Sequence, residues 1–212
     1  MTRPQRLVLV AGTATEIGKT WVGGEVLARL RAGGVTVAAR KPAQSADADD
    51  TGPSDAQVLA ASTGEDPDVV CLPRRTYAVA MAPPMAAAAL GLTPPTTAEL
   101  LAELTWPDPA VQVGWLETVG GPRSPIAVDG DAASLATSLD PDVLLLVADA
   151  GLGTVNAVLV SVAAFMPATV VVFLNRYDAD EELHRRNLDW LRTREGLEVV
   201  VDLEALVDRV RP

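Results

Sequence analysis

The sequence is poor in cysteine, in aromatic residues and in long apolar segments, and each shortage limits what the protein can be. Its one cysteine, Cys71, cannot form a disulfide within the chain, which fits a reducing, cytoplasmic environment. Aromatic residues make up 4%, so the core must be built mainly from Ala, Val and Leu. The most apolar segment, residues 143–175, is interrupted by Asp149, Asn156 and Pro167. It therefore lacks the ~20 uninterrupted apolar residues that a membrane-spanning helix needs.

Basic residues are also scarce. The chain has 28 acidic and 17 basic residues and a net charge of −11. A nucleic acid or an anionic membrane surface needs a basic face on its partner, so neither is expected here. Small anionic ligands are compatible with this charge, because a few local donors can outweigh the overall field. The length of 212 residues predicts a single domain, residues 1–212.

Short apolar, β-branched segments alternate with longer amphipathic ones. Strands buried on both faces are predicted at residues 7–11, 35–39, 111–116, 143–148, 169–174 and 198–201. Helices are predicted at 19–31, 54–62, 85–90, 97–104, 131–139, 154–165, 180–194 and 203–210. This alternation predicts an α/β fold, with a doubly wound, mostly parallel sheet and helices on both of its faces. Ligands of such a sheet bind at the carboxyl ends of the strands.

Residues 11–20, AGTATEIGKT, carry the clearest functional signal. A predicted strand comes before them, a predicted helix follows, and the segment ends in Gly18, Lys19 and Thr20, which is the context of a phosphate-binding loop. Five residues separate Gly12 from Gly18, where the common motif has four. Backbone N–H groups and the helix N-terminus can still surround a phosphate in this longer loop. Lys19 would contact the outer phosphates, and the Thr20 hydroxyl would be able to bind Mg²⁺.

The scarcity of lysine supports a phosphate-binding role for the two lysines that the chain has. The chain has only Lys19 and Lys41, and its other basic residues are arginines. A compact ammonium is thus kept at two places where it can meet phosphate. No chemical role is assigned to His184, which lies in a polar helical segment. The four tryptophans are interpreted as packing residues: Trp21, Trp106, Trp115 and Trp190.

Several motifs, in the same order, resemble those of the dethiobiotin synthetases, which are related to the MinD/ParA ATPases and the cobyrinic acid amide synthases. GTATEIGKT is similar to the family's GTxTEVGKT loop. The further matches are Arg40-Lys41-Pro42 with Ser45, Ser54-Asp55-Ala56, residues 81–87, Leu116-Glu117, residues 151–156 and Asn175. The resemblance implies a P-loop NTPase fold and an ATP-dependent ligase of biotin biosynthesis. Such an enzyme closes 7,8-diaminononanoate and CO₂ to dethiobiotin through a carbamate and a carbamic-phosphoric anhydride.

The resemblance also implies a role for each matching residue. Mg²⁺ would be bound by Thr20, Asp55 and Glu117. ATP, the second substrate, would be contacted by Thr13, Glu16, Ile17, Gly18, Lys19, Thr20 and Asn175. The catalytic groups would be Thr15, Lys19 and Lys41. The diamine substrate would be contacted by Thr15, Lys41, Ser45, Gly151, Leu152, Gly153 and Asn156, and the last four would receive its carboxylate across a homodimer interface. On residue type alone, Asp55 could equally be a charge at a helix start and Glu117 a carboxylate at a strand end.

The sequence departs from the family pattern directly after Glu117. The family has Gly-Ala-Gly-Gly there, and this chain has residues 118–121, Thr-Val-Gly-Gly. A β-branched threonine cannot adopt positive φ, or allow a ligand as close to the backbone, as cheaply as glycine does. Thr118 is therefore expected to restrict this loop.

Other departures leave two alternative functions open. Ala46 replaces a glycine, Gly151 stands where some members have a charge, and residues 176–178 follow Asn175 without a recognisable late, proline-containing adenine loop. The protein could be a non-catalytic, nucleotide-binding relative of the family. It could also be a switch ATPase of the MinD/ParA type, although its loop lacks the second lysine typical of that class.

Overall fold

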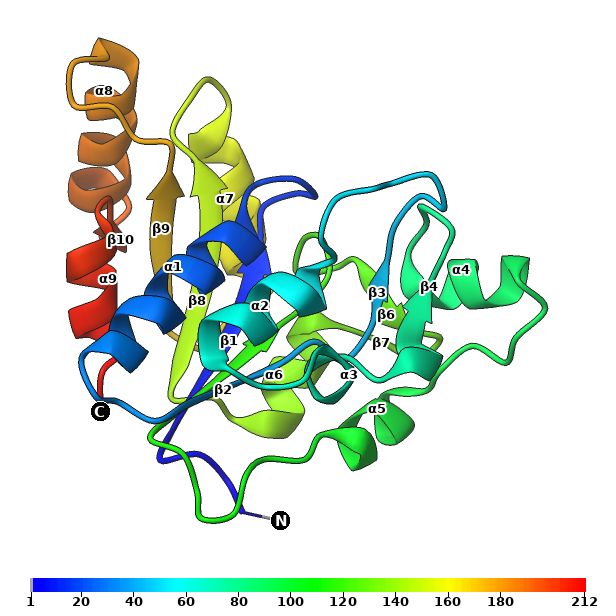
Figure 1. Ribbon diagram of the computed structural model, residues 1–212. Coiled ribbons are helices and arrows are strands. Elements are labelled where there is room, and N and C mark those ends of the chain that lie inside the picture. Colours follow the sequence, from blue (N-terminus) through cyan, green and yellow to red (C-terminus); the bar gives the residue numbers. More distant parts are fainter. Residues whose placement is uncertain (1) are drawn as a thin grey trace.

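A six-stranded sheet forms the centre of the protein. The structure is a computed structural model, and it describes residues 2–212 (Figure 1). The strand order is β10-β9-β8-β1-β5-β2, and all neighbouring pairs are parallel. The strands are β1 (Arg6–Gly12), β2 (Val37–Arg40), β5 (Val113–Glu117), β8 (Val143–Asp149), β9 (Val170–Asn175) and β10 (Glu198–Val200). All six predicted strands are present, each within two residues of its predicted start, and the predicted parallel sheet is confirmed.

The strands are apolar throughout because both of their faces are buried. In β1, Val8 and Val10 belong to one buried cluster, whereas Leu7, Leu9 and Ala11 belong to the other. Successive side chains of a strand point to opposite faces, so each face receives an apolar set. This explains why the sequence shows continuous apolar segments and no polar alternation.

Helices cover both faces of the sheet (Figure 1). On one face, α1 (Lys19–Ala32), α2 (Asp55–Thr63) and α9 (Leu203–Val210) contribute to one apolar cluster. The other cluster receives residues of α4 (Pro83–Ala89), α5 (Thr97–Glu103), α6 (Ala132–Leu139) and α7 (Thr154–Ala163). The predicted doubly wound arrangement is therefore confirmed.

The structure differs from the prediction in its short elements. The helix predicted at 180–194 is α8 (Glu182–Asp189) followed by a π-helical turn, η2 (Trp190–Arg194). The sequence did not predict two helical turns, α3 (Pro67–Val70) and η1 (Pro73–Arg75). It also did not predict two pairs of short strands. In one pair β3 (Gln44–Ser45) lies beside β4 (Thr76–Tyr77), and in the other β6 (Pro125–Ala127) lies beside β7 (Gly130–Asp131). These pieces of two to four residues are too short to show a periodic pattern, and β3 pairs with a strand more than 30 residues away.

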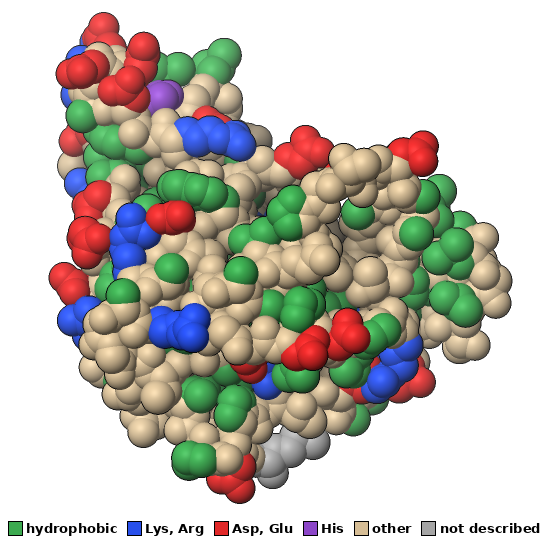
Figure 2. All heavy atoms as spheres, viewed as in Figure 1, with side chains coloured by type: hydrophobic (Ala, Val, Ile, Leu, Met, Phe, Trp, Pro, Cys, Tyr) green, Lys and Arg blue, Asp and Glu red, His purple; other side chains and the backbone are tan. Residues whose placement is uncertain are grey.

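The surface carries acidic and apolar side chains in different places. Figure 2 shows acidic side chains along the left and upper parts of this face, and apolar side chains gathered on the right, over α4. The exposed apolar residues in and beside α4 include Met81, Met85 and Leu90. Within residues 2–212, no helix combines the length and the apolar character needed to span a bilayer.

Candidate active site

The predicted site residues converge at the carboxyl edge of the sheet because of the strand order. β5 lies between β1 and β2, and its last residue, Glu117, is paired with Val10 of β1. On its other side, Leu116 is paired with Arg40, the last residue of β2. Lys41 therefore follows β2 next to Glu117, and the phosphate loop follows β1 on the opposite side.

Residues 13–18 form the loop between β1 and α1, and Gly12, predicted to begin the loop, is the last residue of β1. Gly18 has a positive φ of 91°, and a Cβ on it would collide with the Asn175 amide, so only glycine fits there. Nδ2 of Asn175 donates a hydrogen bond of 3.0 Å to the carbonyl oxygen of Ile17. The end of β9 thus holds the end of the loop in place.

The three predicted metal-binding residues meet at the start of α1. Oγ1 of Thr20 lies 2.7 Å from Oδ1 of Asp55 and 2.8 Å from Oε1 of Glu117. Asp55 is the first residue of α2, whose start is fixed by a capping box between Ser54 and Gln57. The structure thus brings together residues up to 97 positions apart in sequence.

Lys41 completes this cluster. Its Nζ lies 2.6 Å from Oε1 of Glu117 and 2.6 Å from Oδ2 of Asp55. The Lys41 and Glu117 side chains are 2% and 0% exposed, so this is a buried ion pair. Burial lowers the pKa of Lys41, but the charges of Glu117 and Asp55 outweigh that effect and raise the pKa well above its ordinary value. The ammonium therefore stays charged at all physiological pH values.

Lys19 is the second ammonium of the site. It is buried at the start of α1, and its Nζ lies 3.4 Å from the carbonyl oxygen of Ala14 in the loop. Burial lowers the pKa of Lys19, and the nearby charge of Lys41 lowers it further. Binding an anion beside Lys19 would offset both unfavourable effects, which is what a phosphate group would do.

The donor set fits a hard divalent cation. Oε2 of Glu117 is buried and has no hydrogen-bond partner, which is a costly state for a carboxylate oxygen unless a ligand meets it. In the described part of the chain no three His, Cys, Asp or Glu side chains form a metal cluster, so the protein offers two carboxylates and one hydroxyl. Mg²⁺ is commonly held by one or two carboxylates, with phosphate and water oxygens completing its shell.

Thr118 carries no backbone strain in the loop after β5, because its φ is not positive. Among residues 118–121 only Gly120 has a positive φ, of 52°, and it is a glycine here as in the family. The backbone N–H and the hydroxyl of Thr118 both donate to the carbonyl oxygen of Val10, at 2.9 and 2.8 Å. The buried threonine thus fastens this loop to the end of β1.

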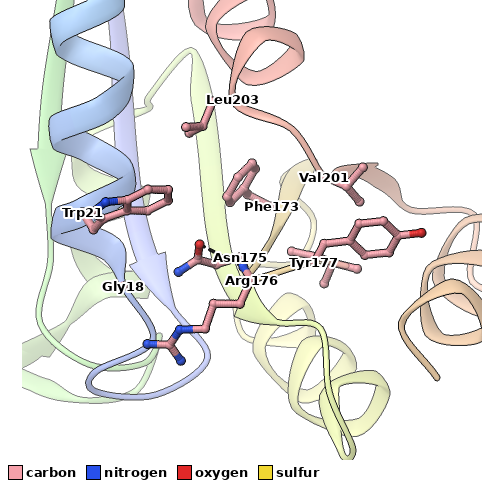
Figure 3. A pocket seen from close by; sticks show the side chains of 9 residues that line it. Gly18, Trp21, Phe173, Asn175, Arg176, Tyr177, Val201 and Leu203 are labelled. Atoms are coloured by element: carbon pink, nitrogen blue, oxygen red, sulfur yellow. Dashed lines mark hydrogen bonds between the residues drawn. The ribbon is translucent and has the colours of Figure 1, made fainter. Parts of the chain in front are cut away.

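A cavity of about 480 Å³ opens beside the phosphate loop (Figure 3). Trp21 of α1 lies on one side of it and Tyr177 and Val201 on the other, with Phe173 and Asn175 of β9 between them. Trp21 is 52% exposed, so its interpretation as a packing residue was wrong. A planar, partly apolar group attached to a phosphate chain would fit this position next to Gly18.

Arg176 also lines this cavity, and its role was not predicted. Its guanidinium pairs with Asp149 at 3.2 Å and donates to the carbonyl oxygen of Glu16 at 3.3 Å. It therefore ties the ends of β8 and β9 to the phosphate loop. The only sequence signal was its position directly after Asn175.

The predicted substrate-binding residues are divided between several places. Thr13 and Thr15 line a second cavity, on the side of the loop that faces α7. The hydroxyl of Ser45 donates to the carbonyl oxygen of Met81 at 2.5 Å. Within residues 2–212, no hydrogen bond or ion pair joins the start of α7 to the Lys41 cluster, and neither cavity is lined by Gly151, Leu152, Gly153 or Asn156. Leu152 is 93% exposed.

Comparison with known proteins places this site in a family. A family model described as an AAA domain matches residues 6–210. The chain is 34% identical to an "ATP-dependent dethiobiotin synthetase BioD" of Haloferax mediterranei, over 84% of this chain and 75% of that protein. It is 31% identical to the protein of the same name from Rhodococcus jostii, over 94% of this chain and 86% of that one. A crystal structure of the signal recognition particle receptor FtsY from Elizabethkingia anophelis shares the fold alone, with a TM-score of 0.50 and 15% identity over 98% of this chain and 65% of that one. The chain belongs to the dethiobiotin synthetase family.

Proposed function

We propose that this protein is an ATP-dependent dethiobiotin synthetase, a ligase that closes 7,8-diaminononanoate and CO₂ into a cyclic urea. The observation that carries the proposal is the buried cluster of Thr20, Lys41, Asp55 and Glu117 beside a phosphate loop. A non-catalytic relative would have no need to keep these groups at hydrogen-bond distance from one another. Relatives at 31–34% identity carry the corresponding name.

The reaction needs positive charge around a transferring phosphoryl group. One amine of the substrate binds CO₂ as a carbamate, and a carbamate oxygen attacks the γ-phosphorus of ATP, so that ADP leaves. The second amine then attacks the carbonyl carbon of the mixed anhydride and releases phosphate. In this scheme Lys19 and Lys41 neutralise the phosphoryl and carbamate oxygens, which is the usual means of accelerating such transfers. Lys41 is a charged group and not a base, because its carboxylate partners raise its pKa.

Mg²⁺ is proposed as the cofactor, held by Thr20, Asp55 and Glu117 together with phosphate and water oxygens. When bound, it would neutralise negative charge on the phosphates of ATP. Together with Lys19, the cluster has two ammonium groups and two carboxylates, so these formal charges cancel before Mg²⁺ and ATP bind. The protein groups therefore position the nucleotide without a large excess of either charge.

The nucleotide base is proposed to occupy the cavity of Figure 3. Thr13, Glu16, Ile17 and Gly18 would present loop backbone to the phosphates, and Asn175 would face the base. One N–H of the Asn175 amide is already donated to Ile17, which leaves the second as a donor for a ring nitrogen.

A homodimer is proposed, with residues 151–156 completing the substrate site of the partner. The apolar side chains of Leu152, Val160 and Met166, on and beside α7, are largely exposed, and a second copy would cover them. Light scattering after gel filtration tests this, with Leu152→Asp expected to shift the protein to a monomer.

We further propose that residues 1–212 act as one domain, in the cytoplasm, where ATP is available.

The deciding experiment measures phosphate release from ATP with Mg²⁺ and bicarbonate, with and without the diamine acid. Release that depends on the diamine, together with a product of the mass of the cyclic urea, is the expected result. ATP binding without substrate-dependent release would instead support the non-catalytic alternative. Release that is independent of the diamine would support a switch ATPase.

A further inference from the structure

The position of Asp55 depends on how the start of α2 is held. Further along, the helix is anchored by Leu59, which belongs to an apolar cluster. Before the helix, residues 47–52 form hydrogen bonds only within that segment, among residues 2–212. The capping box of Ser54 and Gln57 lies within the helix start, so it shapes the first turn without fixing it to the sheet. A fixed position for Asp55 therefore needs a contact from another segment.

Gln44 supplies such a contact to the backbone. Its Oε1 accepts a hydrogen bond of 3.0 Å from the N–H of Ala56, in the peptide group directly after Asp55. This N–H is one of the first-turn donors that have no partner within a helix. Gln44 follows shortly after Lys41, whose Nζ lies 2.6 Å from Oδ2 of Asp55. The segment after β2 thus contacts the start of α2 at two points, the Asp55 carboxylate and the backbone beside it.

The side-chain amide of Gln44 is fixed in one orientation. Its Nε2 donates to Oγ1 of Thr76 at 3.0 Å, and Thr76 lies opposite Gln44 in the pair of β3 and β4. If the amide were reversed, its NH₂ group would face the N–H of Ala56, which is also a donor. Gln44 is 7% exposed and Ala56 is 2% exposed, so water does not easily reach this bond. Removal of the amide would therefore leave the N–H of Ala56 without an acceptor.

The bond from Gln44 differs from the contacts of the Asp55 carboxylate in its response to a metal ion. That carboxylate contacts the Thr20 hydroxyl at 2.7 Å and the Lys41 ammonium at 2.6 Å. A cation would compete with both groups, because all three are attracted to the same carboxylate oxygens. The N–H of Ala56 is a donor and no ligand of a cation, so its bond to Gln44 is kept. Gln44 can therefore hold the start of α2 both with and without the ion.

We propose that Gln44 is a positioning residue of the metal site, which holds Asp55 where its carboxylate can share a cation with Thr20 and Glu117. This inference rests on the function proposed above, in which Mg²⁺ is the cofactor. Hydrogen bonds that orient metal ligands typically change the affinity for the metal by about 10- to 100-fold. Gln44 acts through the backbone of α2, so its loss should weaken metal binding while the phosphate loop keeps its own contacts.

The test measures the Kd for Mn²⁺, a paramagnetic substitute for Mg²⁺, in the complex of the protein with a non-hydrolysable ATP analogue. Electron paramagnetic resonance follows the free ion, and turnover does not enter the result. Gln44→Met is similar in size and removes both hydrogen bonds of the amide, so the Kd should rise about tenfold. Gln44→Asn is milder, because its shorter side chain only withdraws the oxygen from Ala56, and it should raise the Kd in the same direction. In turnover, the Mg²⁺ concentration that gives half the maximal rate should rise, and kcat at saturating Mg²⁺ should stay close to the native value.

Two further variants sharpen the test. Gln57→Met is the matched control, because Gln57 also bonds to backbone at the start of α2, the N–H of Ser54 at 2.8 Å, but that bond stays within the helix start. It should lower the melting temperature and keep the native Kd for Mn²⁺. Asp55→Ala should itself weaken Mn²⁺ binding, and adding Gln44→Met to it should weaken binding no further, because the carboxylate that Gln44 positions is then absent.

The outcomes separate this role from the proposed reaction. Weaker Mn²⁺ binding in both Gln44 variants, with native binding in Gln57→Met, supports the role of Gln44 even if turnover does not depend on the diamine. Native binding in either folded Gln44 variant overturns the role, also where the diamine is turned over. A further loss when Gln44→Met is added to Asp55→Ala overturns it as well, because Gln44 would then act elsewhere. A native complex that binds no Mn²⁺ overturns it together with the proposed cofactor.

Discussion

Replacing Lys41 by methionine should destabilise the protein strongly when Mg²⁺ is absent. Methionine is of similar length and is apolar, so it fills the space and removes the charge. Nζ of Lys41 is the cation within 2.6 Å of Glu117, which is 0% exposed. Without it, a buried carboxylate keeps only the Thr20 hydroxyl and the more distant Lys19 as compensation.

The expected magnitude follows from this geometry. Removing one partner of a buried ion pair typically costs about 3–5 kcal/mol. The lower end applies here, because the Asp55 side chain is 42% exposed and is partly solvated without Lys41. With an m-value of about 2 kcal/mol/M in urea, a loss of about 3 kcal/mol moves the unfolding midpoint down by roughly 1.5 M.

The assay is urea unfolding followed by circular dichroism, in EDTA and in Mg²⁺. Mg²⁺ should restore part of the stability of Lys41→Met, because a bound cation would replace the ammonium between the two carboxylates. Arg40→Met is the matched control: Arg40 is also buried and forms an ion pair of 2.7 Å with Glu65, but it is not part of the cluster. Arg40→Met should also destabilise the protein, but adding Mg²⁺ should not restore any of the lost stability.

A double variant tests the cause. Lys41→Met combined with Glu117→Gln removes both buried charges, so it should be more stable than Lys41→Met alone. Turnover should be lost in Lys41→Met while the affinity for ATP changes little. A Lys41→Met protein within about 1 kcal/mol of the native one, or a double variant no more stable than the single one, would refute the reasoning.

Three further predictions follow from individual contacts. Thr118→Val should lower the free energy of unfolding by about 1 kcal/mol by removing the hydroxyl bond to β1, with kcat unchanged; a large loss of kcat would show that the hydroxyl takes part in the reaction. Trp21→Ala should raise the KM for ATP several-fold and leave that for the diamine unchanged, and an unaltered KM for ATP would remove Trp21 from the base site. Burial raises the pKa of Asp142, but the Leu7 N–H and the Arg3 guanidinium outweigh this and hold it below its ordinary value. Its charge therefore stabilises the fold at neutral pH, and this contribution is lost as the pH falls below about 4. Asp142→Asn should accordingly be less stable than the native protein at pH 7, and the difference should shrink as the pH falls below about 4; a difference that stays constant with falling pH would contradict this assignment.

The elements and the phosphate loop were determined by local sequence patterns. The continuous apolar segments predict the six strands, and the loop with Gly18, Lys19 and Thr20 is recognisable because its motif lies within ten residues. The predicted ends of helices were less exact where the preference of a particular residue for the end of a helix decided the boundary. α4 begins at Pro83 and not at residue 85, because proline is well suited to the first turn of a helix.

The composition of the site was predictable only in part. The resemblance to a family selected Lys41, Asp55 and Glu117, but no local pattern indicated that Trp21, Arg123 and Ser161 line cavities. Their positions depend on which distant segments pack beside them. Likewise, the sequence suggested strain at Thr118, whereas only the tertiary structure shows its hydroxyl bonded to Val10.

The sequence by itself therefore determined the strands, the helices and the loop that binds phosphate, because these depend on neighbouring residues. The tertiary structure decided how the loops combine. β5 lies between β1 and β2, although it comes later in the chain than both. That insertion places Glu117 between the phosphate loop and Lys41, and brings a carboxylate, a hydroxyl and an ammonium within hydrogen-bond distance across almost 100 residues of sequence. Strand order is set by long-range packing, which no local pattern records.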